Sequence, residues 1–385
     1  MSLPAIPPTQ SPALGAESSA QDARRWAWGT WLNLLGPIVG LLAIFIFFWV
    51  LIGNSFVTFY NIQTILRQST VTCMAAIGAT FVIISAGIDL SIGSALAVAA
   101  MVIASLLKLT FVDHAHGDAS VSYLSVHPAM WPVICAAVGI LIGLVTGLIN
   151  GSLITGLRVV PFIVTLGTMM IYRGFTEAVS VVSINPDDNW LLKLLAAPDI
   201  PDWVEKSAAR PVLQWLFLAP GIWITLGMAV IMALVLNYFR FGRHTIAIGS
   251  NEQTARLCGI PVGRTKVLIY LVSGFFAGLA GVMQYARQRQ GSPAGGLGLE
   301  LDVIAAVVIG GASLNGGKGS IMGTIVGSLI MTVIASGCSQ VPIPASFPSW
   351  IGEGVGLQSY VQKIVTGGII VAAVFIDKLR QRRSD

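Results

Sequence analysis

The sequence predicts an all-α, polytopic membrane protein with about ten transmembrane helices. Its 385 residues are 55% hydrophobic and only 10% charged, and the mean hydropathy is +0.81. A water-soluble core cannot bury so large an apolar fraction, whereas membrane-spanning helices require one. The 42 glycines agree with this prediction, because small residues let membrane helices approach closely.

Two regions are expected along the chain. Residues 1–24 are rich in Pro, Ser, Ala and Gln and have no periodic pattern, which predicts a disordered cytoplasmic tail. Residues 25–380 are predicted to form one transmembrane domain. The apolar run at about 31–52 is too long for a signal-peptide core and has no clear small-residue cleavage site after it. We therefore expect it to be retained as the first span.

Nine further apolar runs are predicted to span the membrane, at about 63–86, 90–110, 129–151, 160–182, 219–239, 266–286, 301–315, 320–338 and 357–377. The run at 301–315 is short and interrupted by glycines, so a half-helix or re-entrant segment is the alternative there. Ten crossings place both termini on one side of the membrane. Nine would leave the basic C-terminus outside.

The basic residues favour the arrangement with both termini in the cytoplasm. Thirteen of the 22 Lys and Arg residues then lie inside, including pairs at both ends of a polar loop at 240–265. Three longer segments, about 111–128, 183–218 and 339–356, lie on the outer side. The second is expected to form short helices along the outer surface, as either a solvated loop or a rim that faces a partner.

The polar loop at 240–265 is predicted to carry a short helix over about 251–258. Ser250 and Gln253 fit a capping box at its start. Gly259 fits a left-handed C-cap, and Pro261 prevents the helix from continuing. A helix of roughly two turns is too short to be stable alone in water. We therefore expect this cytoplasmic helix to dock on a partner.

Asp89 lies in the junction between the second and third spans, which runs from 87 to 93 with almost no loop. A carboxylate inside a span costs roughly 2.5–3.5 kcal/mol on insertion scales. One interpretation is that Asp89 caps the third span by accepting backbone N–H groups near Ser91 and Ile92. The other is that Asp89 contacts the solute or a gate, and the two roles are compatible.

Several small and polar residues punctuate the other spans. Glycines recur every four residues at 143, 147 and 151, at 274 and 278, and at 323 and 327, which predicts close helix packing. Asn150 interrupts the inner end of the fourth span, and Pro161 fits the first turn of the fifth. Thr165 then either bonds its own backbone or lines a path. Arg173 and Glu177, one turn apart, are predicted to form an ion pair.

The sequence encodes no catalysis. Glu300 and Asp302 lie near the start of the eighth span, where acidic side chains suit the helix dipole. The Gly-Gly-Lys-Gly turn at 316–319 is not a phosphate loop, because Gly319 stands where Ser or Thr is required and Ala312 where Gly is required. No other nucleotide or catalytic motif occurs, the four cysteines lack metal or redox spacing, and the dispersed basic residues argue against nucleic acid.

Four of these stretches, at 87–93, 150–167, 247–260 and 300–311, together resemble the permease subunit of ribose/xylose/galactoside-type ABC sugar importers. The resemblance extends from about residue 35 to 377. It implies a multi-pass permease domain in the bacterial inner membrane, working as a homodimer or paired with a similar permease. It also implies a cytoplasmic ABC ATPase, which binds the ATP and Mg²⁺, and a periplasmic sugar-binding protein. The permease itself would bind no cofactor.

The resemblance assigns expected roles to individual residues. The 240–265 loop corresponds to the coupling segment, whose short helix fits a cleft on the ATPase, and Arg256 is a candidate for contact with an acidic partner. The candidate coupling residues are Gly249, Ser250, Asn251, Gln253, Ala255, Arg256, Gly259 and Ile260. The candidate residues for the translocation path or gate are Asp89, Ser91, Asn150 and Thr165.

Two other functions stay open at this point. A permease of the same wider group could carry a non-sugar solute, such as a branched-chain amino acid or a signalling sugar derivative. An ion-coupled secondary transporter that uses Asp89 would need more buried carboxylates or broken helices in matching halves. The sequence offers only a faint similarity between 87–99 and 298–311. The long outer segments leave the sugar and its binding protein undetermined.

Overall fold

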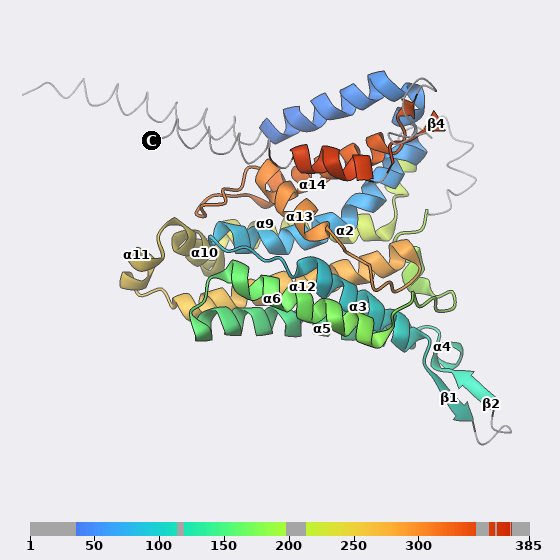
Figure 1. Ribbon diagram of the computed structural model, residues 1–385, viewed down its shortest axis with the longest axis horizontal. Coiled ribbons are helices and arrows are strands. Elements are labelled where there is room, and N and C mark those ends of the chain that lie inside the picture. The colour runs from blue at the N-terminus through green and yellow to red at the C-terminus, as the bar shows by residue number, and fades with distance from the viewer. Residues whose placement is uncertain are drawn as a thin grey trace, which may run out of the picture.

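The computed structural model describes residues 36–113, 119–197, 213–343, 354–358, 360–369 and 371. They form a bundle of helices that run nearly side by side (Figure 1). The longer helices are Gly36–Ile52, α2 (Phe59–Ile84), α3 (Ile92–Leu107), α5 (Met130–Leu157), α6 (Pro161–Val179), α9 (Pro220–Tyr238), α12 (Val262–Gln288) and α14 (Ile321–Cys338). The all-α prediction is confirmed.

Helices α2 and α12 form the centre of the bundle. Helix α2 packs against α12, α13, α14 and α9 and is almost completely buried. Helix α12 also packs along α3 and α5. The side chains of α2 are small or β-branched along much of its length, and Thr58 caps its start by accepting from the Asn61 backbone N–H at 3.4 Å. Helices α3, α5, α9, α13 and α14 thus pack directly on this pair, whereas α6 packs on α3 and α5.

The predicted glycine faces meet one another across helix interfaces. A Cβ added at Gly147 of α5 would overlap the carbonyl oxygen of Tyr270 in α12, and one at Gly143 would overlap that of Gly274. A Cβ at Gly327 of α14 would likewise overlap the backbone of Ala306. The prediction of close packing is confirmed. The structure also shows that the glycine face of α5 packs on α12 and that of α14 packs on α13.

The predicted eighth span is a half-length helix. Helix α13 (Leu299–Ile309) has 11 residues, or about 16 Å at 1.5 Å per residue, roughly half of a 30 Å hydrocarbon core. It begins after Gly298, ends at Gly310, and packs on α14 and α2. The half-helix alternative therefore describes this segment better than a full crossing.

The polar loop and the longer outer segments lie at opposite ends of the bundle (Figure 1). Helices α10 (Arg240–Ser250) and α11 (Glu252–Leu257) occupy one end. The hairpin of β1 (Thr110–Asp113) and β2 (Ala119–Ser122) extends from the other end, where β3 (Pro342–Ile343) pairs with β4 (Gly354–Val355). The two small sheets, and the short helix α4 (Tyr123–Val126), were not expected from the sequence.

The segment at 183–218 is described in part. Its helix η3 (Trp190–Leu194) is a short helix of the kind expected there, and η4 (Gln214–Leu216) precedes α9. Trp190 donates to the carbonyl of Ala129 at 3.0 Å, and Asn189 donates to the hydroxyl of Tyr285 at 2.8 Å. These bonds fix η3 against α12 and the start of α5, at the end opposite α11.

The number of membrane spans stays a prediction. Five helices of the described residues are long and apolar enough to cross, and Gly36–Ile52 and Ile92–Leu107 are shorter apolar helices. In the predicted tenth span, 360–369 is helical. The predicted tail at 1–24 and most of the basic C-terminal group lie outside the described residues.

Candidate functional site

The predicted coupling loop contains two helices instead of one. Helix α10 was not expected, and it carries the chain directly from α9 to Ser250. The predicted capping box is wrong: the Ser250 hydroxyl donates to the carbonyl of Ile246 at 3.0 Å, as part of α10. Asn251 is the N-cap of α11, because its side-chain oxygen accepts from the Thr254 backbone N–H at 2.9 Å. The start of the helix is shifted by one residue, since α10 already uses Ser250.

The end of α11 has the capping motif that the sequence predicts. Gly259 has φ +80°, and its N–H donates to the carbonyl of Arg256 at 3.1 Å. The N–H of Ile260 donates to the carbonyl of Ala255 at 3.1 Å. This pair of bonds is a Schellman motif, which satisfies two carbonyls that the helix end would leave free. The sharp stop holds α11 to six residues.

One face of α11 is anchored and the other is exposed. Ala255 is buried with Ile248 of α10 and Val262 of α12. Gln253 and Leu257 face outward, and Leu257 is 88% exposed. A single exposed apolar side chain is common on protein surfaces, so Leu257 marks the free face of α11 without identifying a partner by itself. No sequence motif pointed to Leu257, because the motifs of this loop mark only where the helix begins and where it ends.

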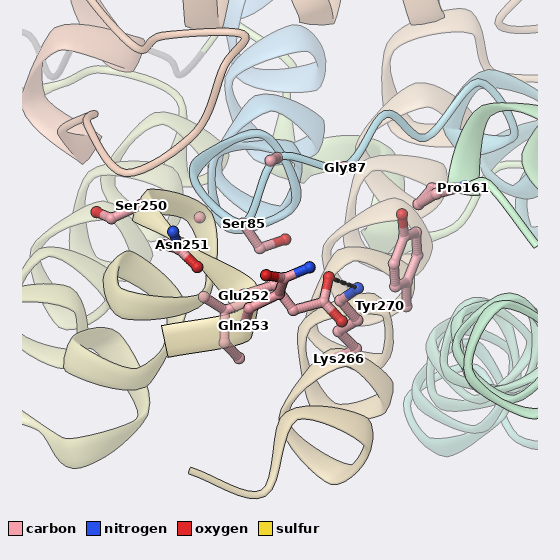
Figure 2. Close-up of a pocket in the computed structure, with 12 residues that line it drawn as sticks. Ser85, Gly87, Pro161, Ser250, Asn251, Glu252, Gln253, Lys266 and Tyr270 are labelled. Atoms are coloured by element: carbon pink, nitrogen blue, oxygen red, sulfur yellow. Dashed lines mark hydrogen bonds and ion pairs between the residues drawn. The ribbon is translucent and has the colours of Figure 1, made fainter. Parts of the chain in front are cut away.

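An ion pair fixes α11 against α12. The Lys266 ammonium donates to the Glu252 carboxylate at 2.7 Å (Figure 2). The Arg256 guanidinium approaches the same carboxylate at 3.3 Å. The hydrogen bond from Lys266 is the main cause that lowers the pKa of Glu252. Arg256 therefore has an acidic neighbour within the chain. Its side chain is still 69% exposed and open to a second carboxylate.

The end of α10 is seated on the end of α2. A Cβ at Gly249 would overlap the carbonyl oxygen of Ile84 and come within 2.6 Å of the Gly317 nitrogen. The same Ile84 carbonyl accepts from the Gly317 N–H at 2.8 Å. Phe241 of α10 stacks on Phe81 of α2, with ring centroids 5.5 Å apart. The end of α10, which leads directly into α11, therefore contacts the backbone just before Gly87.

Asp89 lies five residues beyond this contact and is buried, with 5% of its surface exposed. Its Oδ1 accepts from the backbone N–H of Ser91 at 3.0 Å and from the Ser91 hydroxyl at 2.7 Å. Its Oδ2 accepts from the hydroxyl of Ser273 on α12 at 3.1 Å. The predicted helix cap is wrong in detail, because Ser91 is the N-cap residue and Ile92 begins the helix. The carboxylate instead closes a turn and ties it to α12.

Four helices contribute to one chain of hydrogen bonds that ends at Asp89. Tyr172 of α6 donates to Asn150 of α5 at 3.2 Å, and Asn150 donates to the Ser91 hydroxyl at 2.7 Å. Thr165 of α6 donates to the carbonyl of Ile88 at 3.2 Å. The four candidate path or gate residues are thus gathered in one buried cluster. The sequence missed Tyr172 and Ser273, since no local pattern distinguishes them from packing residues.

The two acidic residues of α13 lie in its first turn, as predicted. The Glu300 carboxylate packs directly against Gly93 of α3 and accepts from the Gly298 N–H at 3.3 Å. The stretches at 87–93 and 300–311 are therefore neighbours. The predicted pair of Arg173 with Glu177 is wrong: Arg173 donates to the carbonyls of Pro293 and Gly295, both at 2.8 Å, in the segment before α13.

The arrangement of acidic, histidine and cysteine side chains in the described residues is unlike that of metal sites. In the described part of the chain, no group of three or more His, Cys, Asp or Glu residues is placed to hold a metal ion. Cys73, Cys135 and Cys338 are buried packing residues, and Cys258 is exposed at the end of α11.

Comparison with known proteins decides the family. Residues 61–374 match the family described as "Branched-chain amino acid transport system / permease component". The chain belongs to this permease family. It is 34% identical over 364 residues to the ribose import permease protein RbsC of Escherichia coli (strain K12), covering 94% of this chain and 98% of the relative.

Two other relatives extend this similarity. The permease is 33% identical to the D-allose transport system permease protein AlsC of the same strain, over 94% of this chain and 97% of AlsC. It is 31% identical to the L-arabinose transport system permease protein AraH, over 96% of this chain and 98% of AraH. No solved structure matches it. The similarity therefore includes the polar cluster and both ends of the bundle.

Proposed function

We propose that the chain is the permease subunit of an ABC importer and forms the path for a monosaccharide. The observation that carries this proposal is its similarity, over nearly its whole length, to permeases named for ribose, D-allose and L-arabinose. Because these relatives share a class of neutral, hydroxyl-rich solutes, we infer that class and not one sugar. An ion-coupled mechanism is not favoured, since both oxygens of Asp89 already accept hydrogen bonds from serines.

Energy for transport would come from a separate cytoplasmic ATPase, which binds the ATP and Mg²⁺. Three features of α11 support docking there: the helix is short, it is capped at both ends, and Gln253, Arg256 and Leu257 are exposed. Its other face is anchored to α10 and α12, so a push on α11 would be carried to the end of α2. We assign the coupling role to the segment from Gly249 to Ile260.

The polar cluster around Asp89 would act as the gate that this motion switches. Its residues come from α3, α5, α6 and α12, so relative movement of these helices must rearrange the bonds. In the proposed orientation both termini and α11 are cytoplasmic, and the end carrying β1–β2 and η3 faces a periplasmic sugar-binding protein. A second permease subunit, identical or similar, would complete the path.

Reconstitution of the intact transporter tests this function. The chain would be placed in liposomes with its ATPase and binding protein, and uptake of labelled ribose, allose, arabinose and leucine would be measured with and without ATP. We expect ATP-dependent accumulation of at least one sugar and none of leucine. Concentrative uptake by the purified chain alone, or uptake of leucine in preference to every sugar, would show that the proposal is wrong.

A further inference from the structure

A pocket of about 350 Å³ lies between the coupling segment and the end of α2. Its walls come from four places in the sequence: the turn at 85–87, Pro161, the segment 248–253, and the first turns of α12. Figure 2 shows Ser250 and Asn251 on one side, Tyr270 and Pro161 on the other, and Gly87 above. This volume is in the range of small-molecule sites. The side chains of the Asp89 cluster do not line this pocket, although Gly87 in its wall is only two residues from Asp89.

The charge of the pocket favours a neutral ligand. Among the described residues that line it, Glu252 and Lys266 carry charge, and these neutralise each other through their 2.7 Å contact. The remaining polar side chains, Ser85, Ser250, Asn251 and Gln253, are hydroxyls and amides, which both donate and accept hydrogen bonds. A charged ligand would have to compete with this ion pair, because Lys266 and Glu252 already neutralise each other. The Ser85 and Ser250 hydroxyls already donate to main-chain carbonyls, and the Asn251 side-chain oxygen already caps α11. The two hydroxyl oxygens therefore offer acceptor positions, and the side-chain amides of Asn251 and Gln253 offer N–H donors, to a molecule with several hydroxyl groups.

Tyr270 supplies an independent sign of a missing ligand. The side chain lines the pocket, is 1% exposed, and has a buried hydroxyl with no hydrogen-bond partner among the described residues. Buried polar groups in proteins nearly always have a partner, so each exception needs a reason. Beside this hydroxyl lies Gly87, where a Cβ would come within 2.8 Å of it. A ligand hydroxyl that reached this edge of the pocket would complete the bonding of Tyr270.

We propose that this pocket binds the imported monosaccharide on the cytoplasmic side and that its occupation inhibits the transporter. This inference rests on the proposed function, because it takes the ligand class and the sidedness from it. A bound sugar would contact Gln253 and Asn251 of the coupling segment together with Ser85 and Tyr270 of the core. By bridging the two, it holds α11 in its present position against α2. The ATPase could then not move α11, and import would slow as free sugar accumulates.

Reconstituted transporter with the ATPase facing outward tests this inhibition. Binding protein and labelled D-ribose would be sealed inside the liposomes, and ATP with increasing unlabelled D-ribose added outside. Outside sugar then reaches only the cytoplasmic face. We expect ATP hydrolysis and ribose release to fall as outside ribose rises. In Tyr270→Phe the half-inhibitory concentration should rise about five-fold, the effect of losing one neutral hydrogen bond of about 1 kcal/mol.

Tyr285→Phe is the matched control, since Tyr285 is a buried tyrosine of the same helix whose hydroxyl bonds Asn189 at the opposite end. It should retain the wild-type half-inhibitory concentration. Each variant's hydrolysis without outside sugar serves as its own reference. A direct readout is the rise in unfolding temperature that ribose causes in the purified chain, which should be smaller in Tyr270→Phe than in Tyr285→Phe.

Two results would overturn the inference while leaving the proposed function intact. One is ATP-driven ribose release that no outside sugar, whether ribose, allose or arabinose, slows. The other is equal inhibition and equal temperature shifts in wild type and Tyr270→Phe. Absence of ATP-driven movement for all three sugars, with no outside sugar present, would instead reject the proposed function and the inference with it.

Discussion

Asp89 shows how a single carboxylate is held inside a helical bundle. It receives hydrogen bonds from Ser91 and Ser273, and its turn is fixed to α6 through Thr165. A buried carboxylate is stable only when such donors surround it. This arrangement gives Asp89 a structural role that is compatible with the proposed gate, because relative movement of these helices would break bonds to the carboxylate.

Replacing Asp89 should therefore affect folding and gating. Asp89→Leu leaves three buried donors without an acceptor, and we expect it to lower the free energy of unfolding by about 3 kcal/mol or more. Asp89→Asn keeps one acceptor oxygen and should cost about 1 kcal/mol. Thermal unfolding of the purified chain measures both. Asp188→Leu, which removes an exposed carboxylate paired with Arg289, is the control and should be nearly neutral. Equal stability of Asp89→Leu and wild type would remove Asp89 from the site.

Gly249 is the residue at which the coupling segment touches α2. Gly249→Ala would force a Cβ into the carbonyl of Ile84, so we expect α10 to shift and ATP hydrolysis to lose its dependence on transport. The ratio of sugar transported to ATP hydrolysed should fall about ten-fold, a change equivalent to about 1.4 kcal/mol. Gly263→Ala is the matched control, because no atom lies within 4 Å of its added Cβ. Equal coupling in the two variants would contradict this account of transmission.

At the scale of elements, the start and the end of α11 are determined by hydrogen bonds within the chain. Its six residues are too few to form a stable helix alone, so the Asn251 cap, the Schellman motif and the Glu252–Lys266 pair must hold it in shape. A preformed helix docks with less loss of conformational entropy than a flexible loop would. Because its caps and ion pair preform it, the short helix α11 suits the coupling role proposed for it.

Gly259→Val should uncouple ATP hydrolysis from transport. The residue has φ +80°, and a β-branched side chain in this region costs about 1–2 kcal/mol or more. Gly259→Asn tolerates the left-handed conformation and should retain most of the coupling. Transport and hydrolysis assays of the intact complex measure the difference. If both variants transport like wild type, the C-cap has no part in coupling.

The Glu252–Lys266 pair predicts how α11 responds to pH. Because the hydrogen bond from Lys266 lowers the pKa of Glu252, the pair stabilises the docked helix above the ordinary value of 4.5 and loses this effect as pH falls through the lowered pKa. We expect the protection of α11 against hydrogen exchange to include a constant contribution from this pair between about pH 8 and 5.5, and exchange to accelerate relative to its intrinsic rate below about 4.5. Lys266→Met should abolish the acceleration. The same acid response in both proteins would assign it to another group.

At the scale of the whole molecule, glycine stripes set the distances between helices. Gly143, Gly147 and Gly151 of α5 let its backbone lie against α12, and this contact positions Asn150 and Ser273 around the polar cluster. Interhelical packing of this kind replaces the hydrophobic driving force that is absent between helices in lipid. The geometry of the polar cluster therefore depends on the α5–α12 interface.

Gly147→Val should separate α5 from α12. Its added atoms would overlap the Tyr270 carbonyl, and we expect a loss of about 3 kcal/mol, the upper end of overpacking costs. Gly156→Val on the same helix meets nothing within 4 Å and is the control. Thermal unfolding and the folded yield in the membrane measure the loss. Similar stability of the two variants would mean that the bundle adapts to the larger side chain.

Much of this molecule follows from local chemistry. Hydropathy predicts membrane helices, Pro161 predicts a first turn, and Gly259 with Pro261 predicts the end of α11, because each signal depends on a few neighbouring residues. The sequence-based predictions were wrong where two residues or two partners could fill the same structural role. Ser250 and Asn251 are both good cap residues, and only the presence of α10 makes Asn251 the cap. Arg173 had two possible partners, and the distant carbonyls before α13 bind it instead of Glu177.

The sequence by itself determined the class of protein, the family resemblance and the presence of a short helix with a glycine C-cap in the 240–265 loop. Those features depend on composition and short-range patterns. Only the tertiary structure decided that Tyr172, Asn150, Ser91, Asp89 and Ser273 form one chain of hydrogen bonds, and that Tyr270 lines a pocket beside α11. The physical reason is that these contacts depend on how closely glycine-rich helices pack, which no single segment specifies.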